Sequence, residues 1–386
     1  MHQKPPIVKD HFNKAKDIYL DYAATTPAHT LVLAAFKRAA IKYYGNPNSA
    51  HALGLKAANE ITKSLRRIRL LLGLPSHYEL IPTSGATESN NLALKGIALQ
   101  YGKFGKTIIT TAFEHPSVIA SANYLAKQGF NVKIAPSNQW GRVDINELEK
   151  LIDDDTILVS VGSINSEIGI RQPIAAIKTM LRQHPKVFFH VDATQSIGKE
   201  NIDLNGVDLI SMAAHKFYGL KGVGLLIKSK RTQLTPIIHG GHSTTLIRRG
   251  TPTTELIVSM EKALRIAMIN FNENNQNVIN INRYIREKLN CIKDIIINST
   301  PEDLPYILNI SILGKESRST IKYMSDHSIY ISNHTACDSE TNTSITILTL
   351  TGDKKRADSS VRLSFSYLTT IDEIDRFITI LKEYIA

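Results

Sequence analysis

Short runs of apolar residues alternate with segments of helical periodicity between about residues 18 and 265. The apolar runs predict strands at 18–22, 78–82, 107–112, 131–135, 157–162, 187–191, 209–213 and 223–227. The periodic segments predict helices at 31–44, 55–72, 89–101, 117–127, 145–151 and 174–183. Strands that alternate with helices favour a mainly parallel sheet with helices on both faces. We therefore expect an α/β fold with a large domain over residues 18–265.

The pattern changes near the end of this region. Residues 255–290 have a long helical periodicity. Short strand candidates follow at 306–310, 328–331 and 360–364, before a final helical segment at 371–384. This order indicates a smaller α+β domain, to which we assign residues 266–386 together with residues 1–17.

Polar residues come just after several of the predicted strands of the large domain. They are Thr87, His115, Asn165, Ser166, Asp192 and Lys216. In an open α/β sheet, ligands bind outside the carboxyl ends of the strands. We therefore expect these side chains to surround one binding site.

Lys216 and Asp192 are the most informative members of this set. Lys216 follows an apolar run and precedes a glycine-rich turn, and Asp192 ends a second apolar run. A partly desolvated lysine has a lowered pKa and can form a Schiff base. Pyridoxal phosphate needs such a lysine for its aldehyde and a carboxylate for its pyridinium nitrogen. A single buried lysine more often forms a structural ion pair, but the combination of Lys216 with Asp192 favours a pyridoxal phosphate site.

Further candidates suit the remaining groups of such a ligand. Small residues around Ala86 and Thr87 follow a strand and open a helix, so backbone amides at the helix N-terminus can hold a phosphate. His115 can stack on an aromatic ring and move protons. Arg362, in the strand candidate 360–364, is suited to bind a carboxylate with two hydrogen bonds.

Charge and composition exclude several classes of protein. The chain has 386 residues and a net charge of +11, which suits anionic ligands. Its lysines and arginines are dispersed, which argues against direct nucleic-acid binding. No apolar run has the ~20 residues of a membrane helix, and the N-terminus lacks the apolar region of a signal peptide, so we expect a cytoplasmic protein. His239 and His242 lack partners at ligand spacing, and no metal site is predicted.

The chain has two cysteines, Cys291 and Cys337, which do not indicate a disulfide framework. Cys291 lies in a helical pattern, and we interpret it as a packing residue. Cys337 lies in the polar segment 331–344, which we expect to be a loop. A thiol in a loop is a candidate nucleophile, and a surface cysteine without a role is the alternative.

Together these motifs resemble the cysteine desulfurases, which are fold-type I pyridoxal phosphate enzymes of the class V aminotransferase group. The resemblance covers nearly the whole chain, and its motifs lie at 19–27, 44–49, 83–91, 114–115, 167–169, 190–195, 215–224, 248–251, 336–337 and 361–364. It implies a seven-stranded, mainly parallel sheet in the large domain, a small domain that carries the cysteine loop, and a homodimer.

The resemblance also implies how the cofactor is held. Lys216 would bind it covalently and then move the substrate α-proton. Asp192 would pair with the pyridinium nitrogen, Gln195 would hydrogen-bond the phenolic oxygen, and His115 would stack on the ring. The phosphate would be held by Ala86, Thr87 and His215, and by Thr251 of a second subunit.

For the substrate, the resemblance implies binding and sulfur transfer. Arg362 would bind the carboxylate of L-cysteine, beside Asn165 and Ser166. Cys337 would attack the substrate sulfur, which leaves a persulfide on Cys337 and releases L-alanine. A protein acceptor that the sequence does not identify would then receive the sulfur, for tRNA or DNA thio-modification, a thio-cofactor or iron–sulfur assembly.

The chain departs from the family pattern at several positions. Ser166 stands where the family usually has a second asparagine, and Ala213 stands where it has a serine. Residues 243–246 replace a charged stretch, and Ser366 and Tyr367 replace a glycine and an arginine. These changes suggest a specialised member.

Two other readings stay open. The first is another enzyme of the same group: a selenocysteine lyase, a cysteine-sulfinate lyase or an aminotransferase. The second is a subunit without catalytic activity that binds the cofactor and scaffolds a sulfur-transfer complex.

Overall fold

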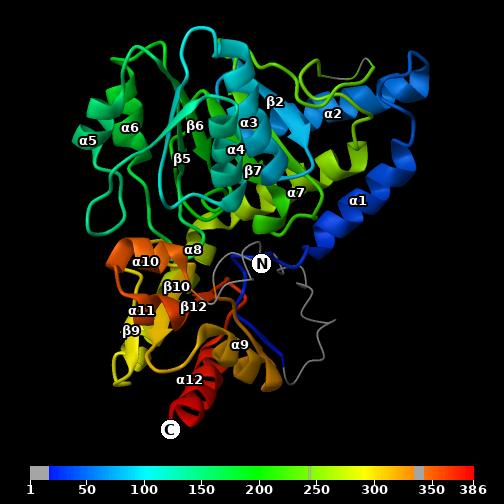
Figure 1. The fold of residues 1–386 in the computed structure, drawn as a ribbon. Helices are drawn as coiled ribbons and strands as arrows, with labels where there is room; N and C mark the ends of the chain where they lie inside the picture. The colour runs from blue at the N-terminus through cyan, green and yellow to red at the C-terminus, as the bar shows by residue number, and fades with distance from the viewer. Residues whose placement is uncertain (1–16, 242, 244, 334–342) are drawn as a thin grey trace.

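The computed structural model describes residues 17–241, 243, 245–333 and 343–386, so the predicted nucleophile Cys337 lies outside the described residues. A large α/β part stands above a smaller part in Figure 1, with α8 (Phe271–Leu289) near their junction. Each part has a large apolar cluster of its own. No described helix combines the length and the apolar character that a membrane span requires.

The large part is built on a seven-stranded sheet. The strand order is β2 (Tyr78–Thr83), β8 (Gly224–Ser229), β7 (Leu209–Ala213), β6 (Phe188–Asp192), β5 (Thr156–Gly162), β3 (Thr107–Thr110) and β4 (Asn131–Ile134). Only β8 runs antiparallel to its neighbours in this sheet. The predicted α/β fold with a mainly parallel sheet is therefore confirmed.

Helices cover both faces of the sheet because its inner strands are apolar on both sides. On one face, Ile210 and Met212 pack with α2 (Ala52–Leu71), α5 (Ile145–Leu151), α6 (Ile174–Leu181) and α7 (Thr254–Ile269). On the other face, Leu209 packs with α3 (Ala86–Tyr101) and α4 (Pro116–Lys127). α1 (Thr30–Lys42) packs against α7, outside these layers.

The smaller part contains a three-stranded antiparallel sheet. Its strand order is β12 (Ser360–Ser364), β10 (Ile307–Ile312) and β9 (Ile295–Ile297). Around it lie α8, α9 (Ser317–Asp326), α10 (Ile345–Thr351), α11 (Lys354–Asp358) and α12 (Ile371–Ile385). A capping box starts α12, in which Thr370 and Glu373 bond each other's backbone N–H.

The structure differs from the sequence-based elements in several places. The predicted strand 18–22 is the short β1 (Ile18–Tyr19), and it pairs with β11 (Ile329–Tyr330) instead of joining the large sheet. Ile18 and Leu20 pack in the apolar cluster of the smaller part. The long helical segment 255–290 is two helices, α7 and α8, that meet at Asn270. The elements β9, α9, α10 and α11 were not predicted.

Candidate active site

A cavity of about 510 Å³ lies at the carboxyl ends of β5, β6 and β7. Residues from strand ends far apart in the sequence line it, together with one strand of the smaller part. Of the predicted site residues, those that line it are Ala86, Thr87, His115, Ser166, Asp192, Gln195, His215, Lys216 and Arg362. The carboxyl ends of parallel strands meet at one edge of the sheet, which explains how these positions come together.

Lys216 ends a single 3₁₀ turn that directly follows β7. Its Nζ donates to the carbonyl oxygens of Ala23 at 2.6 Å and Ala24 at 2.8 Å. Tyr218 adopts a left-handed backbone conformation with φ of 65°, and its N–H donates to the hydroxyl of Thr26. The segment around Ala23 thus folds over the lysine turn and holds the amine at the cavity wall.

Asp192, at the end of β6, has both carboxylate oxygens fixed. Thr194 N–H donates to Oδ1 at 3.0 Å, and Asn90 Nδ2 donates to Oδ2 at 2.8 Å. Asn90 Nδ2 also donates to Ser117 Oγ at 2.9 Å, and Ser117 Oγ lies 2.8 Å from His115 Nδ1. One buried network therefore orients both the carboxylate and the imidazole, the two groups expected on a cofactor ring.

His115 is the N-cap of α4, and its Nδ1 accepts the backbone N–H of Ser117 at 3.1 Å. Burial lowers the pKa of His115, and the nearby Lys216 acts in the same direction, although Asp192 opposes them. A neutral His115 with an accepting Nδ1 carries its proton on Nε2. This ring is therefore suited to stacking on an aromatic ligand without adding charge.

The N-terminus of α3 forms an anion-binding corner of the cavity. Gly85 is the N-cap, and the backbone of Ala86 and Thr87 forms the first turn, where N–H groups lack intrahelical partners. His215 also lines this cavity, and its Nδ1 lies 3.1 Å from Thr25 Oγ1. Burial, with Lys216 nearby, lowers the pKa of His215 to about 4, so the ring is a neutral hydrogen-bonding group at neutral pH.

Arg362 reaches the cavity from β12 of the smaller part and is 1% exposed. Its NH2 donates to Asp21 Oδ1 at 2.7 Å, and its NH1 donates to the carbonyl oxygen of Ser166 at 2.9 Å. The buried Nε of Arg362 has no hydrogen-bond partner among the described residues. A guanidinium that lines a cavity is suited to bind a carboxylate ligand.

Two predicted site residues that the structure describes, Asn165 and Thr251, do not line this cavity. Asn165 uses its amide internally: Nδ2 donates to Phe113 O, and Oδ1 accepts the N–H groups of Glu167 and Ile168. Thr251 is exposed and lines a neighbouring cavity of about 150 Å³. Cys337 is outside the described residues.

Two further observations concern residues that sequence reasoning misread or missed. The interpretation of Cys291 as a packing residue is wrong, because it follows the end of α8 and is exposed. Glu114 was missed: the residue is half-buried with its carboxylate enclosed, and its Oε1 accepts Gly162 N–H at 2.9 Å and Thr111 Oγ1 at 2.7 Å. Burial raises the pKa of Glu114 to about 7. Its place beside His115, after a strand, was the available signal.

Three of the departures from the family pattern, Ala213, Ser366 and Tyr367, lie close to the lysine turn. Ala213 is the last residue of β7, just before that turn. The hydroxyl of Ser366 hydrogen-bonds that of Tyr218, and the ring of Tyr367 lies 4.9 Å from the ring of Tyr218 between centroids. In this chain, the smaller part therefore contacts the lysine turn through neutral groups.

These residues fit pyridoxal phosphate. The cavity offers an amine, a carboxylate with both oxygens fixed, a stackable imidazole and a helix N-terminus for the phosphate. A mainly parallel sheet with such a site at its strand ends defines a fold-type I pyridoxal phosphate enzyme.

Comparisons with known proteins agree with this class. The model of the aminotransferase class-V family matches residues 18–377. A cysteine desulfurase IscS from Colwellia psychrerythraea is 38% identical over 374 residues, 95% of this chain and 92% of that protein. An IscS from Dictyoglomus turgidum is 34% identical over 375 residues, 96% of this chain and 95% of that protein. A solved NifS-like protein has a TM-score of 0.89 at 33% identity, over 95% of this chain and 99% of that chain. The chain belongs to the aminotransferase class-V family, among the cysteine desulfurases.

Proposed function

We propose that this protein is a pyridoxal phosphate-dependent enzyme that takes sulfur from L-cysteine, forms a persulfide on Cys337 and releases L-alanine. The observation that carries the proposal is the shared cavity of Lys216, Asp192 and Arg362, which joins a cofactor site to a carboxylate site. The names of the relatives, cysteine desulfurases over nearly the whole chain, support the choice of substrate.

Within this proposal, several side chains of the cavity each have one role toward the cofactor. When bound, pyridoxal phosphate supplies the electron sink that makes the α-proton of an amino acid acidic. Lys216 holds the cofactor and moves the α-proton, since its amine lies at the cavity wall. Asp192, fixed by Asn90 and Thr194, keeps a negative charge for the ring nitrogen. His115 stacks on the ring.

Other groups hold the phosphate and the substrate. Ala86, Thr87 and His215 contribute hydrogen bonds to the phosphate at the N-terminus of α3. Arg362 binds the carboxylate of L-cysteine, because its guanidinium side chain lines the cavity. Ser166 lines the wall beside it, and Asn165 shapes that wall through its backbone contacts.

Cys337 is proposed as the sulfur-accepting nucleophile. The sulfur needs a thiolate to receive it once its bond to carbon weakens. The other cysteine, Cys291, follows the end of α8 and does not line the cavity. This leaves Cys337, in a polar segment directly before α10, as the better candidate.

We also propose a homodimer with shared sites. Thr251 is exposed and lies outside its own chain's main cavity, which suits a residue that serves a neighbouring subunit. Large apolar side chains are exposed on α1 and α2, namely Leu33, Ile41, Leu53 and Leu55. Burying such side chains against a second copy would remove apolar surface from water.

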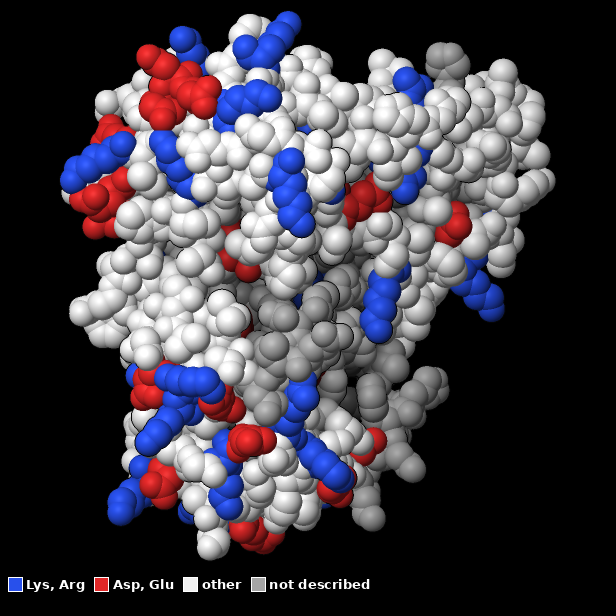
Figure 2. All heavy atoms as spheres, viewed as in Figure 1, with Lys and Arg blue, Asp and Glu red and all other residues white. Residues whose placement is uncertain are grey.

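The acceptor of the sulfur is proposed to be another protein in the cytoplasm, serving thio-modification of tRNA or DNA, a thio-cofactor or iron–sulfur assembly. Direct nucleic-acid binding is not part of the proposal. On the face in Figure 2, lysines and arginines are scattered among acidic residues and do not form one basic patch.

The decisive experiment follows alanine and sulfide production from L-cysteine. Cys337→Ser should keep the yellow cofactor and lose both products, whereas the matched Cys291→Ser variant should behave as the unmodified protein. Alanine production by Cys337→Ser at the original rate would indicate a lyase, and a keto acid product would indicate an aminotransferase. A yellow unmodified protein that makes neither alanine nor sulfide would favour a scaffold subunit, and a protein that stays colourless with excess cofactor would contradict the cofactor site.

A further inference from the structure

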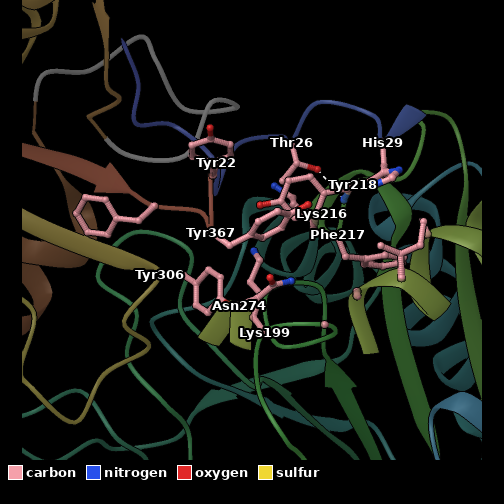
Figure 3. Close-up of a pocket in the computed structure, with 15 residues that line it drawn as sticks. Tyr22, Thr26, His29, Lys199, Lys216, Phe217, Tyr218, Asn274, Tyr306 and Tyr367 are labelled. Carbon is pink, nitrogen blue, oxygen red and sulfur yellow. Dashed lines mark hydrogen bonds between the residues drawn. The ribbon is translucent and has the colours of Figure 1, made fainter. Parts of the chain in front are cut away.

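A second, smaller cavity lies next to the candidate active site, where the two parts of the molecule meet. Tyrosines from both parts enclose it, together with Asn274 of α8, and Lys216 lines both cavities. The tyrosines are Tyr22, Tyr218, Tyr306 and Tyr367. In Figure 3, the side chain of Lys199 extends toward the rings of Tyr218 and Tyr367. None of the roles proposed above uses Lys199.

Lys199 is 6% exposed, and its Nζ donates to Gln195 Oε1 at 2.8 Å. Among the described residues, no carboxylate forms an ion pair with it. Burial lowers the pKa of Lys199 to about 7, and the positive charges of Lys216 and Arg362 add to the effect. A buried lysine without a counter-charge costs stability, so a role for this amine is expected.

Gln195 separates the two cavities and is held on both edges of its amide. Nε2 donates to Ala23 O at 2.9 Å, while Oε1 accepts from Lys199. An ammonium group only donates and a carbonyl oxygen only accepts, so these partners permit one orientation of the amide. That orientation leaves the second N–H of Nε2 as the donor that Gln195 can offer to a ligand in the main cavity.

We propose that Lys199 is a positioning residue that acts through Gln195: it holds the amide N–H as a donor toward an anionic oxygen of the bound cofactor, and that anionic charge in turn favours the protonated, positively charged form of Lys199 behind the amide. This proposal rests on the proposed function. Without Lys199, the amide keeps its contact with Ala23 O but loses the second restraint on its orientation and the charge behind it.

The other titratable groups around Lys199 do not supply the same effect. Burial raises the pKa of Tyr22, Tyr218, Tyr306 and Tyr367, so their hydroxyls are neutral at physiological pH. Burial lowers the pKa of His29, which is therefore also neutral there. Lys216 and Arg362 act electrostatically on Lys199, and Lys262 acts on His29 of the same cavity, whereas Lys199 is the cation whose hydrogen bond to the Gln195 amide the structure describes.

The test is a pH titration of the visible absorbance of the holoenzyme. A donor and a positive charge beside an anionic oxygen favour its deprotonated form. Lys199→Met should therefore raise the pH midpoint by about one unit, a roughly tenfold change in proton affinity. Lys228→Met is the matched control, because Lys228 is a buried lysine at the other end of the sheet, and it should leave the midpoint unchanged.

A double-mutant cycle separates positioning from a general electrostatic effect. In a Gln195→Leu background, Lys199→Met should cause little further shift, because the two residues act as one unit. A full additional shift, or no shift in Lys199→Met alone, overturns the proposal while the proposed function stands. If Lys199→Met does not fold, the same pH titration is made with Lys199→Gln, whose side chain is a shorter neutral donor. If the wild-type protein binds no cofactor, the proposed function itself is contradicted.

Discussion

The two ends of the large sheet handle buried charge in different ways. At the end away from the cavity, Lys228 pairs with Glu79 at 2.9 Å, and Arg231 pairs with the buried Asp208. At the cavity end, among the residues that the structure describes, Lys199 bonds only to an amide oxygen. Within the same residues, Glu114 accepts only from neutral donors, and its Oε2 has no partner.

This difference separates structure from function. A buried charge without a counter-charge lowers the free energy of unfolding. A protein selected for stability alone would therefore pair such a charge or replace it with a neutral residue. The far end pairs its charges. The cavity end keeps Lys199 and Glu114 without a counter-charge among the described residues, as expected of a site that binds a charged cofactor and substrate. The predictions below test this contrast.

The largest expected effect is at the cavity end. Lys216→Ala should abolish covalent attachment of the cofactor and reduce alanine formation by about 10³-fold or more, because the variant lacks the group that moves the α-proton. Borohydride reduction followed by mass spectrometry measures the attachment. Lys228→Ala, at the far end, should still bind the cofactor covalently; loss of attachment in that variant would contradict the division between the two ends.

The second prediction concerns the pH dependence of the apoprotein. The pKa of Lys199 falls from 10.5 in the unfolded chain to about 7 in the folded one. As the pH falls from 10.5 towards 7, the unfolded state binds a proton that the folded state does not, so stability is lost. Lys199→Met removes this loss.

At pH 7, therefore, apo Lys199→Met should be more stable than the unmodified protein, by on the order of 3 kcal/mol, and the gain should vanish above pH 10.5. Urea unfolding at a series of pH values measures it. Lys228→Met should instead be less stable than the unmodified protein, because it leaves Glu79 without its partner. Equal stability changes in the two variants would remove the contrast.

At the far end, Asp208→Asn should reduce the free energy of unfolding by about 2 kcal/mol. The carboxylate of Asp208 accepts from Arg231 and also from the backbone N–H of Phe189 at 3.0 Å. The asparagine weakens the first contact and can lose the second. Denaturant unfolding measures the change, and the cofactor spectrum should stay the same. An altered spectrum would show that this end also serves the site.

The sequence predicted the sheet and the cavity end well for physical reasons. Strands buried on both faces appear as continuous apolar runs, and the polar residue that ends each run marks the edge where ligands bind. This logic found Asp192 and Lys216 without a structure. It failed for β1, because a two-residue strand that pairs with residues near 329 has no local signal.

Burial and hydrogen bonding are the other quantities that sequence patterns do not contain. Lys199 and Glu114 look like surface residues in a sequence, and only the packed structure shows that they are buried beside the cavity. Asn165 shows the reverse error. It stands at the correct strand end, but its amide caps the following turn and does not face the cavity.

The smallest effect is expected at Ser166, where the cavity end departs from its family. Ser166 lines the cavity, and its carbonyl oxygen accepts from Arg362 NH1, so its side chain stands beside the proposed carboxylate site. Ser166→Asn adds a longer amide that can donate one more hydrogen bond to the substrate, worth about 1 kcal/mol, or roughly fivefold in kcat/KM for L-cysteine. Ser166→Ala, which only removes the hydroxyl, is the matched control and should change kcat/KM little. An unchanged or lower kcat/KM in Ser166→Asn would mean that the serine is adapted to this cavity, and that the departure serves something other than binding of free L-cysteine.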